Sequence, residues 1–418
     1  MAQPHTATTN AKITRESEET MIRATRPAST TRMARMSSGF KATLLACAAW
    51  MALAACAAPA AAPTASNTSA APSTAAGKGI QLKDGEKLTV GFIFVGTADD
   101  YGYNYAADQG RLALEKNLPY VKTLAAYSVP ENAEAERVME DMIRQGAKII
   151  FPTSYGHLDP AMNVAKRHPE VTFLHQGGLK NTTNVGTYFG EIWQDVYAAG
   201  IVAGKESKTG KLGFVAAFPI PQVLLNINAF ELGAKSVNPD VKTTVVFTAD
   251  WCNPGKLTDA ANTLMDGGAD VLTAHEDCPA AVIQAAERRG MMSVGYHADG
   301  SPLAPKGWLT GARWTWDGLY TDLVKQVVAG TYVSQIYRAG VKDNVVGLSP
   351  FGAAVTPDVR TLATNAEKGI IDGSVFPFQG PVTDQSGKIR IEAGKRPNTT
   401  ELESTDYLVD GVIGTIPS

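Results

Sequence analysis

From residue 88 onward, short apolar runs alternate with longer segments that have the period of an amphipathic helix. Seven runs have the length and composition of strands: residues 88–95, 148–152, 171–174, 211–217, 243–248, 269–273 and 292–296. Helical patterns lie between them, at residues 105–116, 133–145, 160–167, 193–207, 223–237, 256–266 and 279–288. Strands that alternate with helices at this spacing predict an α/β fold, in which a parallel sheet is covered on both faces.

The alternation falls into two comparable sets, one on either side of about residue 205. Gly-Ala-Lys-Ile-Ile at 146–150 and Gly-Ala-Asp-Val-Leu at 268–272 occupy equivalent places, where a helix ends, a glycine caps it and the next strand begins. This indicates two similar α/β domains rather than one large sheet. In such sheets, ligands bind beyond the carboxyl ends of the strands.

The amino end has the pattern of a bacterial lipoprotein signal. Arg32, Arg35 and Lys41 precede an apolar stretch, residues 42–55, that is too short to span a bilayer and ends at Cys56. We expect residues 1–56 to be leader and signal peptide, with Cys56 as the lipid-attachment site; a plain secretory signal with a chance cysteine is the alternative. Residues 57–87 begin with a run of Ala, Pro, Ser and Thr and predict a flexible stalk. The protein is therefore expected in the cell envelope, lipid-anchored to a membrane and facing the periplasm or the extracellular side.

The charge of the chain limits its possible partners. Without residues 1–56 the chain has 31 Lys and Arg against 38 Asp and Glu, and no basic patch, which argues against a nucleic-acid partner.

Cys252 and Cys278 each follow a predicted strand. An oxidising compartment favours a disulfide between them, but two separate thiols remain the alternative.

Side chains suited to a planar polar ligand collect where the predicted strands end. Asp100, Tyr101 and Asn104 follow the first strand, where aromatic faces could stack on a ring while Asp and Asn read its edge. An Asp helix cap with packing tyrosines explains the same residues. The later strand ends and one aromatic segment contribute further candidates: Tyr155, Trp251, Asn253, Asp277, His297, Asp299, Trp314 and Trp316.

Motifs of common enzymes are missing. The sequence has no G-x-S-x-G, H-E-x-x-H or G-x-G-x-x-G. Residues 200–205 imitate a phosphate-binding loop but follow a helix, so we interpret their glycines as helix packing. His275, Glu276, Asp277 and Cys278 are residue types that bind metals, but adjacent residues on one loop cannot all face one ion. We therefore expect no enzyme, no metal and no cofactor; a secreted nucleoside hydrolase is a weaker alternative.

Several segments, in the same order, resemble the basic membrane protein (BMP, PnrA-like) family of substrate-binding lipoproteins of ABC importers. These are residues 90–96 with 100–104 and 109–110, 188–190 with 199–204, 268–271, 294–296 and 410–414. The resemblance implies a type I periplasmic binding fold, in which two doubly wound lobes joined by three crossovers hold a ligand between them. The lobe boundaries expected from it are 88–205 plus about 302–342, and 206–301 plus about 343–418.

The family's ligands are largely purine nucleosides, and some similar relatives take free purine bases. By resemblance, Asp100 and Asn104 match the acidic and amide positions of the first loop. Trp251 would stack on the base, and Asp277 and the 297–299 loop would supply polar contacts. At Tyr296-His297-Ala298 the family often has Asp, and near Trp314 nucleoside binders have Lys. Both departures favour a purine base.

The resemblance implies a solute receptor that closes by hinge motion and delivers its ligand to an ABC permease. We expect a monomer. A sensory receptor of the same fold, signalling to a membrane kinase, is the alternative.

Overall fold

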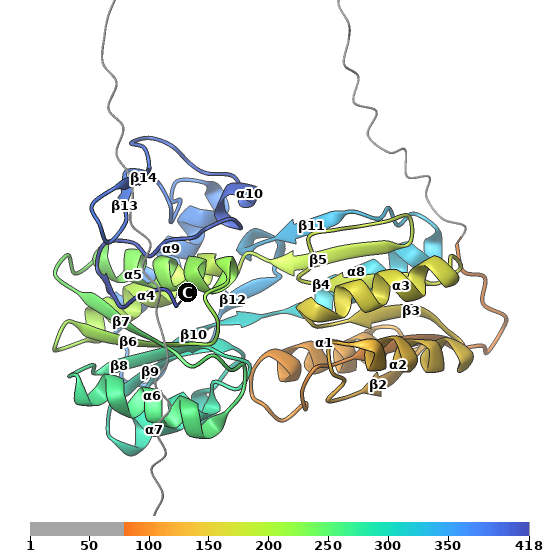
Figure 1. Cartoon of the computed structure of the whole chain (residues 1–418), viewed down its shortest axis with the longest axis horizontal. Helices are drawn as coiled ribbons and strands as arrows, with labels where there is room; N and C mark the ends of the chain where they lie inside the picture. The colour runs from red at the N-terminus through yellow and green to blue at the C-terminus, as the bar shows by residue number, and fades with distance from the viewer. Residues whose placement is uncertain (1–78, 418) are drawn as a thin grey trace, which may run out of the picture. The chain divides into compact units, whose positions relative to one another are not determined.

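The computed structural model describes residues 79–417 (Figure 1). The expected leader, signal peptide and lipid-attachment residue Cys56 lie outside the described residues, as does most of the expected stalk. The last part of that stalk packs on the body. The Ile80 amide donates to the Val328 carbonyl at 3.0 Å, and Ile80 and Leu82 contact the hydrophobic core.

The first lobe is built on a wholly parallel sheet in the order β11-β5-β4-β3-β1-β2. Its strands are β1 (Leu88–Ile93), β2 (Val121–Ala126), β3 (Ala147–Pro152), β4 (Thr172–Gln176), β5 (Val185–Gly190) and β11 (Ile336–Ala339). Its helices are α1 (Tyr103–Asn117), α2 (Ala133–Arg144), α3 (Leu158–Arg167) and α8 (Trp316–Ala329), with a short 3-10 turn, η1 (Tyr155–His157), before α3.

The side chains of β1, and of Phe94 directly after it, show that helices cover both faces of this sheet. Phe92 and Phe94 join the core cluster that contains residues of α1 and α8, whereas Ile93 joins the cluster beneath α2 and α3. Successive side chains of a strand point to opposite faces, so an uninterrupted apolar strand requires a helix layer on each side. The structure confirms the expected α/β class.

The second lobe has the strand order β12-β10-β9-β8-β6-β7-β15, in which β12 is antiparallel to β10. Its strands are β6 (Lys211–Ala216), β7 (Lys242–Phe247), β8 (Val271–His275), β9 (Met292–His297), β10 (Trp308–Trp314), β12 (Val346–Leu348) and β15 (Val412–Ile413). Its helices are α4 (Trp193–Glu206), α5 (Pro221–Lys235), α6 (Pro254–Asp266), α7 (Ala280–Arg288) and α9 (Pro357–Asp372). Smaller elements are η2 (Ser301–Leu303), η3 (Val341–Asp343), β13 (Val382–Thr383), β14 (Ile389–Ile391) and α10 (Thr399–Leu402).

The two lobes repeat one topology. Strands β2-β1-β3-β4-β5 and β7-β6-β8-β9-β10 follow the same order, which is that of a doubly wound sheet. Gly146 and Gly268 both have left-handed backbone, with φ of 95° and 94°, directly after α2 and α6. A residue without a Cβ adopts this conformation without strain, which explains why the same Gly-Ala pair recurs.

The chain crosses between the lobes three times: between β5 and α4, between β10 and α8, and between β11 and β12. The lobe boundaries differ from those expected. Helix α4 packs on α5 and β10, and β10 pairs with β9, so both belong to the second lobe. The expected boundaries put them in the first lobe because β5 and β10 were not recognised as the strands that end each lobe.

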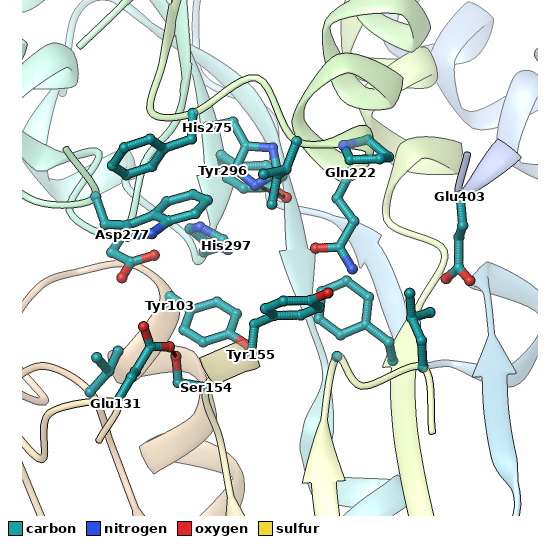
Figure 2. A pocket seen from close by; sticks show the side chains of 18 residues that line it. Tyr103, Glu131, Ser154, Tyr155, Gln222, His275, Asp277, Tyr296, His297 and Glu403 are labelled. Carbon is teal, nitrogen blue, oxygen red and sulfur yellow. Dashed lines mark hydrogen bonds between the residues drawn. The ribbon is translucent and has the colours of Figure 1, made fainter. Parts of the chain in front are cut away.

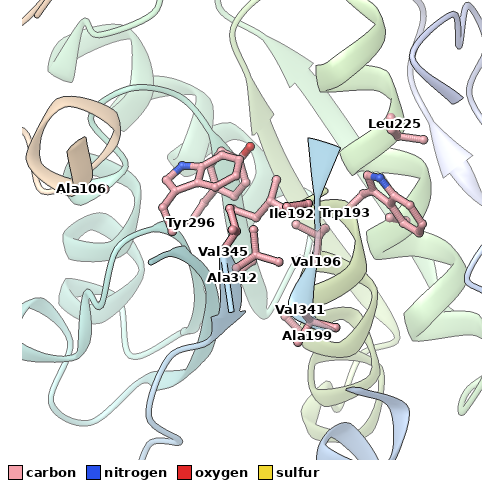
Figure 3. Close-up of a cluster of buried hydrophobic side chains, with 14 of the residues drawn as sticks. Ala106, Ile192, Trp193, Val196, Ala199, Leu225, Tyr296, Ala312, Val341 and Val345 are labelled. Atoms are coloured by element: carbon pink, nitrogen blue, oxygen red, sulfur yellow. The ribbon is translucent and has the colours of Figure 1, made fainter. Parts of the chain in front are cut away.

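Close helix packing determines the position of α4. An added Cβ on Gly200 would lie 2.3 Å from the Phe230 carbonyl oxygen, and one on Gly204 would lie 2.6 Å from the Ala234 oxygen. The two glycines therefore let α4 and α5 approach closely, as the sequence interpretation predicted. Ile192 and Val341, from two of the crossovers, and Val196 of α4 are buried in the main core (Figure 3).

None of the helices within residues 79–417 combines the length and the apolar character that a membrane span requires.

Candidate binding cleft

A cavity of about 500 Å³ lies between the lobes, where the carboxyl ends of both sheets meet (Figure 2). It is lined from the first lobe by Val95, Tyr103, Glu131, Ser154, Tyr155, Gly177, Leu179 and Phe189. From the second lobe it is lined by Phe218, Ile220, Pro221, Gln222, Trp251, His275, Asp277, Tyr296, His297 and Glu403. Its volume is within the range of about 300–1,000 Å³ typical of small-molecule sites.

Aromatic side chains form much of the wall on both sides. Tyr155, the first residue of η1, is 55% exposed, while Phe218 and Trp251 line the cavity from the second lobe, in contact with each other, with ring centroids 5.2 Å apart and planes tilted by 57°. Aromatic side chains from both lobes thus line the cavity and can pack against a planar ring held between the lobes.

One end of the cavity is acidic. Asp277 lies there opposite Glu131, whose carboxylate accepts from the Ser154 hydroxyl at 2.5 Å and from the Gly156 amide at 2.8 Å. Burial raises the pKa of Asp277 well above its ordinary value, and the charges of Asp100 and Glu131 raise it further. This end therefore offers a ligand the acceptor oxygens of Glu131 and a carboxyl group at Asp277 that can also donate when it is protonated.

Two histidines of the second lobe, His275 and His297, differ in the hydrogen-bond partners of their ring nitrogens. His275 Nδ1 is 3.0 Å from the Asn226 amide nitrogen and its Nε2 is 3.3 Å from the Tyr296 hydroxyl, so both ring nitrogens have protein partners. His297 Nδ1 accepts from the Trp314 indole at 2.8 Å, but its Nε2 is buried without a partner. Burial lowers the pKa of His275 to about 3 and that of His297 well below its ordinary value.

A disulfide links the two loops that carry Trp251 and Asp277. Cys252 and Cys278 are bonded, with their Cα atoms 5.2 Å apart, and the Asp277 amide donates to the Trp251 carbonyl at 2.7 Å. Of the two alternatives left open by the sequence, the structure has the bridge. It fixes an aromatic and an acidic wall residue relative to each other.

The lobes also touch beside the acidic end. The Tyr103 amide, at the start of α1, donates to the Asp277 carbonyl at 3.1 Å. An added Cβ on Gly102 would lie 1.9 Å from the same oxygen. At the opposite end of the cavity, Arg338 of β11 pairs with Glu403 through Nε and Oε1 at 2.5 Å.

Of the residues predicted from sequence, Tyr155, Trp251, Asp277 and His297 line the cavity. Asp100 and Asn104 instead form the start of α1. The Asp100 carboxylate accepts from the amides of Gly102, Asn104 and Tyr105, and Asn104 accepts from the Gly96 amide. These contacts match the alternative in which Asp100 caps the helix.

The other predicted residues lie outside the lining. Tyr101 is 38% exposed and stacks on Tyr105. Asn253 caps α6 through Lys256, and Asp299 accepts from the Ser301 amide. Trp314 and Trp316 are buried behind His297 and stack on each other, with their ring centroids 4.8 Å apart.

Several lining residues were not predicted. Phe218, in the loop after β6, and Gln222, at the start of α5, follow the strand equivalent to β1, so the repeat could have identified this segment. Glu131 follows β2, which the sequence did not reveal because this edge strand is half exposed. Glu403 comes from the C-terminal segment, where no local pattern marks it. Within residues 79–417, no group of three His, Cys, Asp or Glu side chains is placed to hold a metal ion.

Comparison with known proteins agrees with this geometry. A purine-binding protein of Brucella abortus is 39% identical over 333 residues, covering 79% of this chain and 95% of its own. A Haloferax volcanii protein, provisionally named as a glucose-binding protein of an ABC transporter, is 30% identical and covers 80% of this chain and 83% of its own. A solved solute-binding protein of an ABC transporter from Conexibacter woesei superposes with a TM-score of 0.60 at 22% identity, covering 69% of this chain and 98% of its own, which supports the fold.

The profile of the PnrA-like substrate-binding proteins of ABC transporters matches residues 87–384. A member of such a family takes a small-molecule ligand outside the cytoplasm and works with a membrane permease. From the cavity between two doubly wound lobes and from these matches, we conclude that the chain belongs to the PnrA-like family of ABC-transporter substrate-binding proteins.

Proposed function

We propose that this protein is the lipid-anchored receptor of an ABC importer, binding a purine base or purine nucleoside between its lobes. In this proposal Cys56 carries the lipid, the binding unit is a monomer, and the permease receives the ligand from the closed form. The protein would act by binding alone, without turnover.

The observation that carries the proposal is the composition of the cavity. Aromatic walls at Tyr155, Phe218 and Trp251 suit a flat ring, and Asp277 and His297 supply polar contacts. A purine has two aromatic faces and an edge with both donors and acceptors, so it can use both kinds of wall. The Brucella abortus relative, named as purine-binding, supports the same class of ligand.

Closure would follow from contacts that a ligand makes with both lobes at once. Tyr155 belongs to the first lobe and Trp251 to the second, so one ring between them touches both only when the lobes are closed. A ligand shifts the population toward the form that it binds more tightly. The Tyr103–Asp277 hydrogen bond would then form together with ligand capture.

The test is calorimetric titration of the mature body after unfolding, ligand removal and refolding. Adenine, guanine, adenosine and guanosine are compared with glucose, because one relative is provisionally named for glucose. Micromolar or tighter binding of a base or nucleoside, without heat from glucose, supports the proposal, and the better ligand of each pair tells whether ribose is accepted. Binding of glucose alone, or no heat from any compound with folded protein, would overturn the purine assignment.

The anchor is tested separately. Cys56→Ser in the full chain should release the protein from the membrane fraction and abolish incorporation of labelled fatty acid. A variant that remains lipid-labelled would refute attachment at Cys56.

A further inference from the structure

Asp277 and Glu131 line the acidic end of the cavity from opposite lobes, and their carboxyl groups differ in their hydrogen bonds. Glu131 Oε1 accepts from the Ser154 hydroxyl at 2.5 Å and from the Gly156 amide at 2.8 Å. Within residues 79–417, no amide or side chain donates to the Asp277 carboxyl, and this residue makes its hydrogen bonds through its backbone alone. The protein therefore stabilises a carboxylate charge on Glu131 but not on Asp277.

The Asp277 carboxyl is open to the cavity. The residue is only partly buried, and neither of its carboxyl oxygens is fully enclosed. Figure 2 shows this carboxyl directed into the gap between the lobes. Its loop is held on both sides, because Cys278 is bonded to Cys252 and the Tyr103 amide donates to the Asp277 carbonyl at 3.1 Å. A ligand in the cavity therefore meets an unpartnered carboxyl group in a fixed position.

The charges around Asp277 disfavour its ionised form. Among the described residues, the titratable groups that act on this carboxyl or are acted on by it are acids and phenols, namely Asp100, Glu131, Glu276, Tyr103 and Tyr296. The two cavity histidines, His275 and His297, are neutral because burial lowers their pKa. Burial raises the pKa of Asp277 well above its ordinary value, and the charges of Asp100 and Glu131 raise it further. Of the two carboxyl groups at this end, Asp277 is the one that keeps a proton.

We propose that Asp277 acts in the closed cleft as a neutral carboxyl group, so that the acidic end selects a ligand edge on which a hydrogen-bond donor lies beside an acceptor. A neutral carboxyl offers one O–H donor and one carbonyl acceptor, whereas a carboxylate offers acceptors only. The inference deepens the proposed function and rests on it for the ligand class. The protonation of Asp277 is measured without any ligand.

The two protonation states prefer different purine edges. Adenine has its 6-amino donor beside a ring-nitrogen acceptor and has no two neighbouring N–H donors, so only a neutral carboxyl makes two hydrogen bonds along that edge. Guanine has a ring N–H beside its 2-amino group, and this pair of donors suits a carboxylate. A neutral Asp277 therefore favours adenine and gives no advantage to a 2-amino group.

Carbon-13 NMR of the side-chain carboxyl tests the protonation in the ligand-free body. The Asp277 signal is assigned by its absence from Asp277→Asn, and its titration midpoint should lie above the ordinary value of 3.8. Glu131→Gln keeps the oxygen that accepts from Ser154 and Gly156 but removes the charge, and should lower this midpoint. A wild-type midpoint at or below 3.8, or one that does not move in Glu131→Gln, would overturn the proposal.

Calorimetric titration with adenine and guanine at neutral pH tests the selectivity. Asp277→Asn keeps one donor and one acceptor but cannot ionise, so it should bind adenine within about threefold of wild type and leave the ratio of the two affinities unchanged. Asp277→Ala removes both groups and should weaken adenine binding at least about tenfold. Asp266→Asn, an exposed carboxylate of the same lobe, is the control and should bind as wild type does.

Three outcomes would refute the neutral carboxyl. Guanine affinity that falls tenfold in Asp277→Asn while adenine affinity is kept would show that an ionised Asp277 reads two donors. Equal losses of adenine binding in the Asn and Ala variants would also contradict it, as would unchanged binding in Asp277→Ala. If folded wild-type protein binds neither base, the purine assignment fails, while the carboxyl titration still decides whether Asp277 holds its proton.

Discussion

The Tyr103 amide donates to the Asp277 carbonyl at 3.1 Å, and this bond joins the amino end of α1 in one lobe to the loop after β8 in the other. The first amides of a helix have no partner within the helix, so this one is available to a neighbouring lobe. The same loop carries the Asp277 carboxylate into the cavity. Contact between the lobes and the lining of the cavity therefore share one residue.

Gly102→Ala should prevent this closed contact. Its Cβ would lie 1.9 Å from the Asp277 carbonyl oxygen and 2.7 Å from Pro279 Cδ, so the lobes would have to stay apart. Affinity for the ligand identified by titration should fall more than about tenfold while the melting temperature of the free protein stays close to that of wild type. Gly318→Ala, in α8 with nothing within 4 Å of the added carbon, is the control. Undiminished affinity in Gly102→Ala would show that closure does not need this contact.

Trp251→Ala should weaken ligand binding by more than about tenfold, because the variant loses a stacking face and its buried apolar area. Trp251→Phe keeps a smaller ring beside Phe218 and should lose less. Titration calorimetry of both variants, with circular dichroism to verify folding, is the measurement. An alanine variant that binds as tightly as wild type would remove Trp251 from the site.

Cys252→Ser combined with Cys278→Ser should lower the free energy of unfolding by about 2–4 kcal/mol, because the bridge closes a loop with a sequence separation of 26. Ligand affinity should fall as well, since Trp251 and Asp277 lose their shared support. Urea denaturation is measured with and without reductant. Reductant should destabilise wild type toward the variant and leave the variant unchanged; a wild-type curve insensitive to reductant, despite verified reduction, would contradict the prediction.

Stability should fall as pH rises from about 4.5 to about 9. Burial raises the pKa of Glu276 from its ordinary value of 4.5 to about 9, so this group is protonated in the folded protein and ionises first in the unfolded chain. The protonated Glu276 therefore makes its full contribution to the free energy of unfolding below about pH 4.5. This contribution is lost as pH approaches 9, by at most about 1.4 kcal/mol per pH unit.

Glu276→Gln tests this assignment, because an amide keeps the oxygen that accepts from Thr248 but cannot ionise. Urea unfolding at several pH values should give a flatter pH profile and a higher stability than wild type under alkaline conditions. Asp266→Asn, an exposed carboxylate, is the control. A profile as steep as that of wild type would assign the pH dependence to other groups.

Glu403→Gln should lower ligand affinity about threefold to tenfold by weakening the ion pair with Arg338 that joins the C-terminal segment to the first lobe. Glu403 lines the cavity and Arg338 does not, so Arg338→Met separates the two possible causes. Similar losses in both single variants and no further loss in the double variant would identify the ion pair. A loss confined to Glu403→Gln would mean that this carboxylate acts on the ligand directly.

Much of the fold could be predicted because its strands are buried on both faces and are uniformly apolar. β1 and β6 were recognised for this reason, and the matching glycines 146 and 268 revealed the repeat. β2 was missed because an edge strand with half-exposed residues does not have a buried pattern. The misplacement of α4 has another cause: a helix that is buried on nearly every side has no exposed polar face to indicate which sheet it covers.

The site was predictable only where a strand directly precedes the side chain. Trp251 and Asp277 follow recognised strands and line the cavity. Trp314 looked like a ligand contact because it is a tryptophan near polar loops, but its indole donates to His297 instead. The difference depends on the direction of one side chain, which spacing along the sequence does not determine.

The position of Glu403 has a consequence for biogenesis. This wall residue follows the remaining cavity residues by more than a hundred positions in the chain. A chain truncated before α10 has every strand of the two sheets except β15 but lacks this part of the wall. The complete cavity can therefore form only after most of the strands of both lobes are already present.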